Sequence, residues 1–334
     1  MQRELRELVE AADLNALLRA VDSLCERREW DQLFDLADVC EDALERGKQL
    51  WPIADHIDYR IALEAPGEYA ARVVTPQPRR FSHGPLTEVA ASSHEWEELA
   101  DHLDSPQTAA YVAQERVLRG EILEGDARAH ADVLDLPLRL EPFEPTYTLA
   151  TFRADHVEVS EPWDPKAPLV DADTRPAREA GDEELTGALL DLVTPWTTES
   201  NGAARAIVVD GDCVGAASAV AGTDLRIGRL EPEEALQRMA WAAASGGAHG
   251  RRRGAAFGRS MAWYVVSVGA GLAWPAVPDE IHRALSDLTW YRWDEGEPEE
   301  GWVLRLAVED RDAGWAAAIG ATDVLEEPGE DDET

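Results

Sequence analysis

Residues 302–320 read WVLRLAVEDRDAGWAAAIG, and this stretch is the strongest indication of the fold class. Two apolar runs, 302–308 and 315–319, flank a polar segment that contains Asp310, Asp312 and Gly314. A polar segment with a glycine between two apolar runs is typical of a turn that joins antiparallel strands. The stretch therefore predicts a β-hairpin close to the end of the chain.

A second hairpin is predicted upstream, where the apolar residues 206–209 lead into Asp210-Gly211-Asp212 and a further apolar run, 213–216, follows. The spacing of apolar residues before and between the hairpins predicts helices. Strands that bracket helices indicate a sheet covered by helices, so the C-terminal part is expected to be an α+β domain of antiparallel hairpins packed on helices. The predicted helices span residues 183–193, 232–244, 250–272 and 278–289.

The N-terminal part has helical periodicity instead. Asp13 is placed to cap a helix, a second helix runs from Trp30 to a stop at Gly47, and the two form an αα-hairpin. Further helices are predicted over 51–63 and 107–123. The motif Glu-Trp-Asp-Gln-Leu at 29–33 returns in similar form at 95–99, an offset of 66 residues (95 − 29), or two units of about 33 residues as in stacked helical repeats. A helical bundle and a short helical-repeat array both remain open.

Three segments follow from these patterns: a helical domain over 1–132, an α+β domain over 133–323 and an acidic disordered tail over 324–334. Composition of β type at 147–152 and 156–160 lies near the start of the second domain. The prolines after it indicate a linker or exposed loop. They are Pro162, Pro165, Pro168 and Pro176. The whole chain is expected to be mostly α with a smaller α+β part.

The charge balance restricts the partners. Asp and Glu number 67 against 31 Lys and Arg, which gives a net charge of −36. Such a field repels nucleic acid and anionic membranes, because contacts to phosphate supply most of their non-specific affinity. Neither is expected as a partner.

The three cysteines, Cys25, Cys40 and Cys213, have no CxxC spacing, and the histidines have no ligand spacing, so neither disulfides nor a metal are expected. The first residues contain no apolar run of signal-peptide length, which predicts a cytoplasmic protein. The stretch 260–277 has no charged residue, and its length is near the lower limit for a membrane span. A buried core helix explains it better.

One segment concentrates positive charge: GGAHGRRRGAAFGR, residues 246–259. If its glycines form a loop that enters a helix, free backbone N–H groups and arginine side chains could hold a phosphate or a carboxylate. If they lie on a helix, glycines at every fourth position allow close packing and the arginines pair with carboxylates. No nucleotide-binding motif is present, and no cofactor is expected. The candidate ligand-binding residues here are His249, Arg251, Arg252, Arg253 and Arg259.

A second candidate segment is PWTTESNG, residues 195–202. Glu199 could act as a general base with His249 as the acid, and Asn201 could add a polar contact. Serine, asparagine and glycine in succession are equally typical of a simple turn.

The glycine and arginine segment followed by Met261-Ala262-Trp263, together with PWTTESNG and GWVLRLAVED, resembles a family of uncharacterised actinobacterial proteins, a conserved domain of unknown function. The resemblance implies no activity. Two classes of function therefore stay open. One is a binding or scaffold protein that contacts protein partners through its helical N-terminal part and holds an anionic ligand near 246–259. The other is an enzyme that acts on a phosphorylated or carboxylated small molecule through the same arginines and His249.

Overall fold

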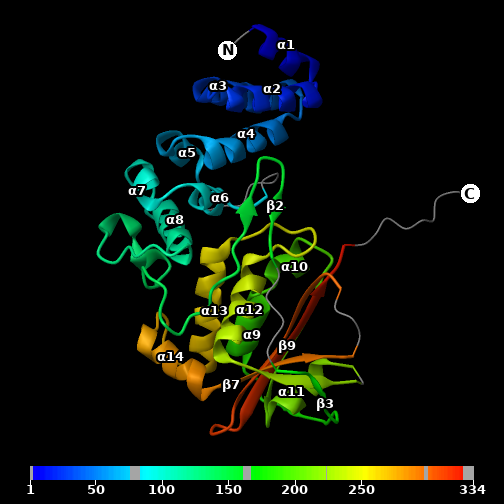
Figure 1. Cartoon of the computed structure of the whole chain (residues 1–334). Helices are drawn as coiled ribbons and strands as arrows, with labels where there is room; N and C mark the ends of the chain where they lie inside the picture. The colour runs from blue at the N-terminus through cyan, green and yellow to red at the C-terminus, as the bar shows by residue number, and fades with distance from the viewer. Residues whose placement is uncertain (1–2, 76–82, 161–166, 223, 297–299, 326–334) are drawn as a thin grey trace, which may run out of the picture. The chain divides into compact units, whose positions relative to one another are not determined.

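The computed structural model describes residues 3–75, 83–160, 167–222, 224–296 and 300–325, and it divides into two compact units (Figure 1). The first unit comprises Met1–Leu134 and Ala150–Val159. The second comprises Asp135–Leu149 and Ser160–Thr334. The prediction of a mostly α protein with N-terminal helices and a smaller C-terminal β part is confirmed.

Short helices build the first unit. The predicted αα-hairpin is present: Asp13 Oδ1 accepts the N–H of Ala16 at 3.0 Å, which caps its first helix, and Leu17, Val21 and Leu33 are buried within it. A two-residue hairpin, β1 (Thr151–Phe152) with β2 (Val157–Glu158), completes the unit. The α-helices are α1 (Arg3–Ala11), α2 (Leu14–Glu26), α3 (Trp30–Asp42), α4 (Trp51–Glu64), α5 (Gly67–Val73), α6 (Leu86–Ser93), α7 (Trp96–Leu99) and α8 (Pro106–Leu118).

The recurring Glu-Trp motif does not mark equivalent structural units. Trp30 begins the 13-residue helix α3, whereas Trp96 begins the four-residue helix α7, which continues as a short 3₁₀ turn. Both tryptophans are buried. The similarity therefore reflects a shared way of starting a helix with a tryptophan that packs into the core.

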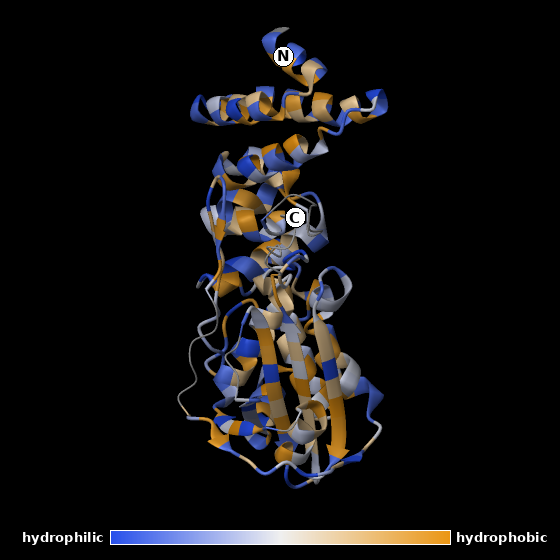
Figure 2. Ribbon diagram, turned by 90° about the vertical axis from the view of Figure 1, so that its right-hand side faces the viewer, coloured by the Kyte–Doolittle hydropathy of each residue, from blue (hydrophilic) through white to orange (hydrophobic). Residues whose placement is uncertain are grey.

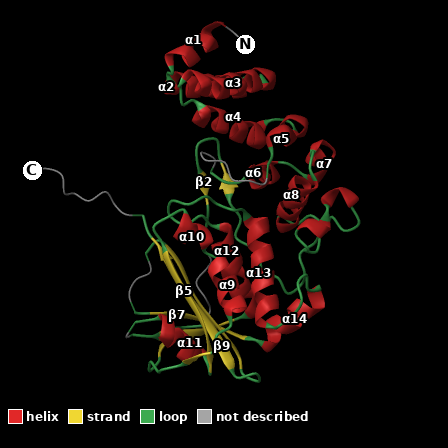
Figure 3. Ribbon diagram, turned by 180° about the vertical axis from the view of Figure 1, so that it is seen from behind, coloured by secondary structure: helices red, strands yellow, loops and turns green. Residues whose placement is uncertain are grey.

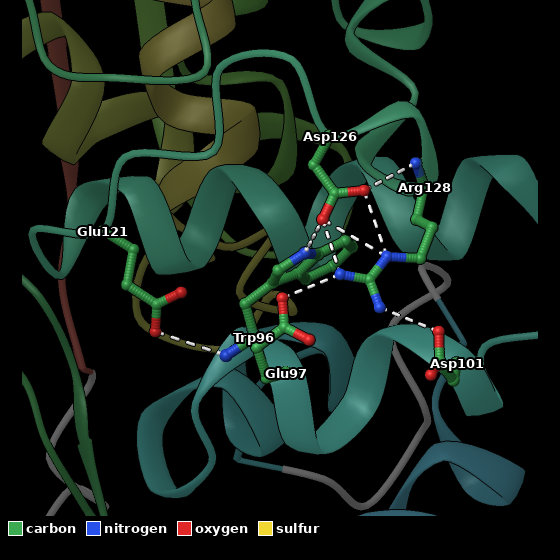
Figure 4. Close-up of polar contacts among 6 residues, drawn as sticks. All are labelled: Trp96, Glu97, Asp101, Glu121, Asp126 and Arg128. Atoms are coloured by element: carbon green, nitrogen blue, oxygen red, sulfur yellow. Dashed lines mark hydrogen bonds and ion pairs between the residues drawn. The ribbon is translucent and has the colours of Figure 1, made fainter.

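Trp96 is held by a cluster of polar contacts that Figure 4 shows in close-up. Its Nε1 donates to Asp126 Oδ2 at 2.8 Å, and its backbone N–H donates to Glu121 Oε1 at 3.2 Å. The guanidinium of Arg128 donates to both oxygens of Asp126 and reaches Asp101 and Glu97 at 2.8 and 2.7 Å. The cluster fastens α7 to the segment that follows α8.

Asp126→Asn should lower the free energy of unfolding of the first unit by about 1–2 kcal/mol at pH 7, because it removes the negative charge that strengthens the contacts from Arg128 and Trp96. Hydrogen bonds from Arg128 and then from Trp96 lower the pKa of Asp126. A lowered folded pKa gives stability that is present above the unfolded pKa, about 4, and is lost as the pH falls further. Urea unfolding between pH 7 and pH 2.5 should show a flatter profile in the variant. The control is Asp101→Asn, since that carboxylate is 72% exposed, and an equal effect in both variants would contradict the prediction.

A seven-stranded antiparallel sheet organises the second unit, in the order β3-β6-β7-β8-β9-β5-β4. The predicted C-terminal hairpin is its centre: β8 pairs with β9 from Trp302↔Asp323 to Asp310↔Trp315. Gly314 has a φ of 76°, a left-handed conformation that favours glycine, and its N–H donates to the Asp310 carbonyl at 2.8 Å. The strands are β3 (Val170–Asp171), β4 (Arg178–Glu179), β5 (Ala203–Asp210), β6 (Arg226–Leu230), β7 (Thr289–Asp294), β8 (Trp302–Asp310) and β9 (Trp315–Asp323).

The second predicted hairpin is wrong. Residues 213–220 form the helix α11 (Cys213–Val220), and β5 pairs with β9 and β4 instead. Asp212 is the cause, because its Oδ1 accepts the N–H of Gly215 at 3.0 Å and so caps a helix at the point where a strand was expected. A short apolar run such as 213–217 does not by itself distinguish a strand from a helix.

Helices cover both faces of the sheet (Figure 3). α11 packs on β5, β8 and β9 through Ala216 and Ala217, which share a buried cluster with Ala307 and Ala318. Side chains alternate along a strand, so the buried Leu306 and Ile319 belong to the other face. On that face α9 contacts β5 and β9, and α12 contacts β6, β7 and β8. Besides α11, the α-helices of the second unit are α9 (Glu183–Asp191), α10 (Thr194–Thr198), α12 (Pro232–Ala244), α13 (Ala255–Gly269) and α14 (Pro278–Asp287).

The long strands are coloured mainly as hydrophobic in Figure 2, with isolated hydrophilic bands, as a sheet buried on both faces requires.

The predicted helix 250–272 is shorter than expected, because Gly254 precedes it with a φ of 95°. The stretch 260–277 supplies most of α13, and Trp263 and Val266 are fully buried there. No helix within the described ranges is long and apolar enough to cross a membrane. Parts of the predicted linker (161–166) and tail (326–334) lie outside the described residues.

Candidate functional site

The glycine loop, residues 245–254, joins α12 to α13 and folds around a buried carboxylate. Asp323, at the end of β9, is 1% exposed. Its Oδ2 accepts the N–H of Ala248 at 2.6 Å, and its Oδ1 accepts the hydroxyl of Ser200 at 3.0 Å. Backbone N–H groups in a loop that precedes a helix can bind an anion. In this loop the bound group is the carboxylate of the chain's own Asp323.

Close backbone approach explains the glycines of this loop. A Cβ on Gly247 would lie 2.1 Å from Asp323 Oδ2, and one on Gly246 would lie 2.2 Å from the carbonyl oxygen of Gly250. These residues are not helical, so the alternative of one glycine stripe along a helix is wrong. Of the four glycines in the predicted stripe, only Gly258 lies within α13, where a Cβ would meet the Ala240 carbonyl oxygen of α12 at 2.2 Å.

Three of the predicted site residues meet at the surface of this loop. The backbone N–H and Nε of Arg251 donate to Glu199 Oε2 at 3.2 and 2.8 Å. The backbone N–H of His249 donates to Ser200 Oγ at 3.1 Å, and its side chain is exposed. The hydrogen bond from Arg251 lowers the pKa of Glu199. Asn201 is exposed in the turn that follows.

The other predicted arginines lead away from this point. Arg253 Nη1 donates to the Asp191 carbonyl at 3.1 Å, and its guanidinium stacks on Phe257 at 3.7 Å from the ring centroid. Arg259 is fully buried in α13, where it pairs with Glu144. Arg252 is half-buried. An external anion bound at residues 246–259 stays a prediction.

A second feature was missed by the sequence analysis: an open groove of about 570 Å³ at the start of α11. β3 and β4 lie at opposite edges of the sheet, so the segment that connects them runs from one edge to the other. Arg175 of this segment lines the groove. We call it the α11 groove. Its lining residues are Arg175, Gly211, Asp212, Cys213, Val214, Ile227, Tyr291, Glu309 and Arg311.

Glu309 organises the wall of the α11 groove. It is 3% exposed, and it accepts the Cys213 N–H at 2.9 Å, the Tyr291 hydroxyl at 3.0 Å and Arg311 Nε at 2.6 Å. Burial opposes its ionisation, but the hydrogen bonds from Cys213 and Arg311 outweigh that effect and lower its pKa. Glu309 is therefore a buried anion with its partners in place.

Cys213 and Tyr291 keep their protons at neutral pH. Burial, followed by the charge of Glu309, raises the pKa of the Cys213 thiol to about 12. Burial is also the main cause that raises the pKa of Tyr291 to about 12. The thiolate is the reactive form of cysteine, so Cys213 offers no activated nucleophile.

Two arginines at the rim retain unused donors. Arg311 is 67% exposed and uses Nε and Nη2 for Glu309 and Tyr291. Arg175 is 51% exposed; its Nη2 pairs with Asp212, and its backbone N–H donates to Ser218 Oγ at 3.2 Å. Nη1 of Arg311, and Nε and Nη1 of Arg175, contact no acceptor within the part of the chain that the structure describes. Such guanidinium donors fit a carboxylate or a phosphate.

No group of three or more His, Cys, Asp or Glu side chains in the described segments is placed to hold a metal ion. Fold and sites define a protein with a helical unit and a unit built on a seven-stranded antiparallel sheet, with a groove of ligand size beside α11. The model of a family described as Family of unknown function (DUF6183) matches residues 15–324, and the chain belongs to this family. No curated protein and no solved structure matches it.

Proposed function

We propose that this chain is a binding protein for a small organic acid, which it holds in the α11 groove. The open arginine donors at the rim carry the proposal, because a guanidinium binds a carboxylate with two parallel hydrogen bonds. Val214, Ile227 and the Tyr291 ring supply apolar contacts for the rest of the molecule. The volume of about 570 Å³ is in the range of small-molecule sites.

Binding is favoured over catalysis by the protonation states of the candidate residues. The raised pKa values of Cys213 and Tyr291 leave both as hydrogen-bond donors. The alternative base, Glu199, has a lowered pKa, which makes it a weaker proton acceptor. Its carboxylate is also occupied by Arg251.

The test is calorimetric titration of the full chain with benzoate and hexanoate, each compared with its neutral amide. We expect the acids to bind and the amides to bind at least tenfold more weakly, since a charged hydrogen bond contributes about 1.5–3 kcal/mol. Arg311→Gln and Arg175→Gln should each weaken acid binding by roughly tenfold. Arg178→Gln is the matched control, because Arg178 is 85% exposed and pairs with Asp210 outside the groove.

The proposal fails if neither acid binds, or if both groove variants bind the acids as the wild type does. Circular dichroism of each variant confirms that it is folded. This control matters most for Arg311→Gln, because Arg311 also contacts the buried Glu309.

A further inference from the structure

A smaller hollow of about 220 Å³ lies beside the other end of α11, on the same face of the sheet as the α11 groove. We call it the Gly320 pocket. It shares no lining residue with the α11 groove. Its lining residues are Ala203, Ala204, Arg205, Val220, Trp293, Glu295, Arg305, Gly320, Ala321 and Thr322.

The strand register places two arginines on either side of this glycine. Gly320 in β9 is directly opposite Arg205 of β5 and directly opposite Arg305 of β8. Directly paired residues point to the same face, and neighbouring strands are about 4.8 Å apart, so the two arginines start roughly 10 Å from each other. A Cβ at position 320 would lie 2.9 Å from Trp293 and from Val220. The Trp293 ring and Val220 therefore lie directly over Gly320, and the two arginines flank this apolar surface.

Arg305 is held in position by its surroundings. It is 15% exposed, its Nη2 donates to Glu295 Oε2 at 3.1 Å, and its guanidinium lies 5.5 Å from the centroid of the Trp293 ring. Glu295 is itself fixed, since its other oxygen accepts the N–H of Gly222 at 2.7 Å. Nε and Nη1 of Arg305 have no hydrogen-bond acceptor among the residues described.

Arg205 is different, because its side chain is exposed and makes no hydrogen bond or ion pair over the described ranges. The charged side chains that line the pocket are two arginines and one glutamate, so the pocket carries a charge of +1 (2 − 1) in a chain of −36. An arginine without a carboxylate is unexpected where acidic residues outnumber basic ones 67 to 31. Glu295 balances the charge of Arg305, so the net positive charge of the pocket comes from Arg205.

We propose that the Gly320 pocket binds a small oxoanion, a phosphate, sulfate or carboxylate group, between Arg205 and Arg305. Arg305 provides a fixed guanidinium, and Arg205 closes on the anion from the solvent side. The volume of about 220 Å³ is below the usual range for whole organic ligands, which favours a single anionic group. The proposal stands on different residues from the α11 groove and does not depend on the function proposed for it.

The experiment measures the melting temperature of the full chain in phosphate, sulfate, acetate and chloride at equal ionic strength. The ³¹P line width of inorganic phosphate in the presence of the protein gives a second measure of phosphate binding. We expect at least one oxoanion to stabilise the protein more than chloride does, and the strongest of the three identifies the preferred group. Arg205→Gln should weaken that binding at least tenfold. Its melting temperature in chloride should equal that of the wild type, because Arg205 has no partner to lose.

Arg178→Gln is the control and should retain oxoanion binding, and Arg175→Gln and Arg311→Gln are measured beside it to locate the bound anion. The proposal is overturned if no oxoanion exceeds chloride, or if Arg205→Gln binds as the wild type does. Loss of binding in Arg175→Gln and Arg311→Gln alone would place the anion in the α11 groove and would also overturn it. Failure of organic acids to bind the α11 groove leaves this result unaffected, so the two proposals are separable.

Discussion

Arg259→Met should lower the free energy of unfolding of the second unit by about 3–5 kcal/mol, the usual cost of breaking a buried ion pair by removing one partner. The side chains of Arg259 and Glu144 are both fully buried. Nε and Nη2 of Arg259 donate to the two oxygens of Glu144 at 2.8 and 2.5 Å. The variant leaves a buried carboxylate whose remaining donors are Tyr147 and Trp263.

The same arginine also fastens the segment Asp135–Leu149 to α13. Its Nη1 donates to the Pro137 carbonyl at 3.0 Å, and its Nη2 donates to the Arg139 carbonyl at 2.8 Å. Methionine fills a similar volume but supplies none of these donors, so the carbonyl groups of Pro137 and Arg139 lose this contact as well. The effect should therefore reach the upper part of the expected range.

Urea unfolding followed by tryptophan fluorescence measures this change. Arg251→Met is the matched control, because the pair of Arg251 with Glu199 is exposed at the surface, 44% and 33%, and such pairs contribute at most about 1 kcal/mol. In a double variant with Glu144→Leu, the loss should be smaller than the sum of the two single losses, since no unpaired charge remains. A loss in Arg259→Met no larger than that in the surface control would refute the prediction.

Local chemistry explains which parts of the fold could be predicted. The hairpin of β8 and β9 follows from residues close together in the sequence, and Gly314 takes the left-handed conformation that its turn requires. Helices were found where apolar residues recur with helical spacing, as in α9 and α12. The strands β6 and β7 were missed, because residues 226–230 and 289–294 have no turn signal that links them, although they pair with each other.

Candidate sites were harder to predict, because their residues meet only in the folded chain. Arg259 was grouped with Arg251 by sequence, yet its partner Glu144 lies 115 residues away. The α11 groove brings together residues of three strands, one helix and the segment before β4. One signal was available, since Asp212 three residues before Gly215 can be a helix cap as well as part of a turn. Arg205 and Arg305 could be related only through the register of β5 and β8 with β9.

Asp323→Ala should lower the free energy of unfolding by about 2–4 kcal/mol, because it removes the buried acceptor of the glycine loop and leaves two half-buried donors without this contact. The Ala248 N–H and the Ser200 hydroxyl both lose their contact with the carboxylate. Ser200 in turn accepts the N–H of His249, so the change reaches the surface where Glu199 and Arg251 meet. Thermal and urea unfolding measure the loss, and Asp323→Asn, which keeps one oxygen acceptor, should lose less.

The same variant tests whether the glycine loop can accept an anion from solution. Removing the carboxylate leaves a space lined by the Ala248 N–H, the Ser200 hydroxyl and Gly247, whose missing Cβ gives the carboxylate room. Formate is small enough to replace the lost group, so it should raise the melting temperature of Asp323→Ala more than that of the wild type, with chloride at equal ionic strength as the reference. A selective gain would show that the loop recognises carboxylates through its backbone, as its position before α13 suggests. An equal response in both proteins would mean that its donors act only on Asp323, and that the predicted ligand residues around Arg251 stabilise the fold.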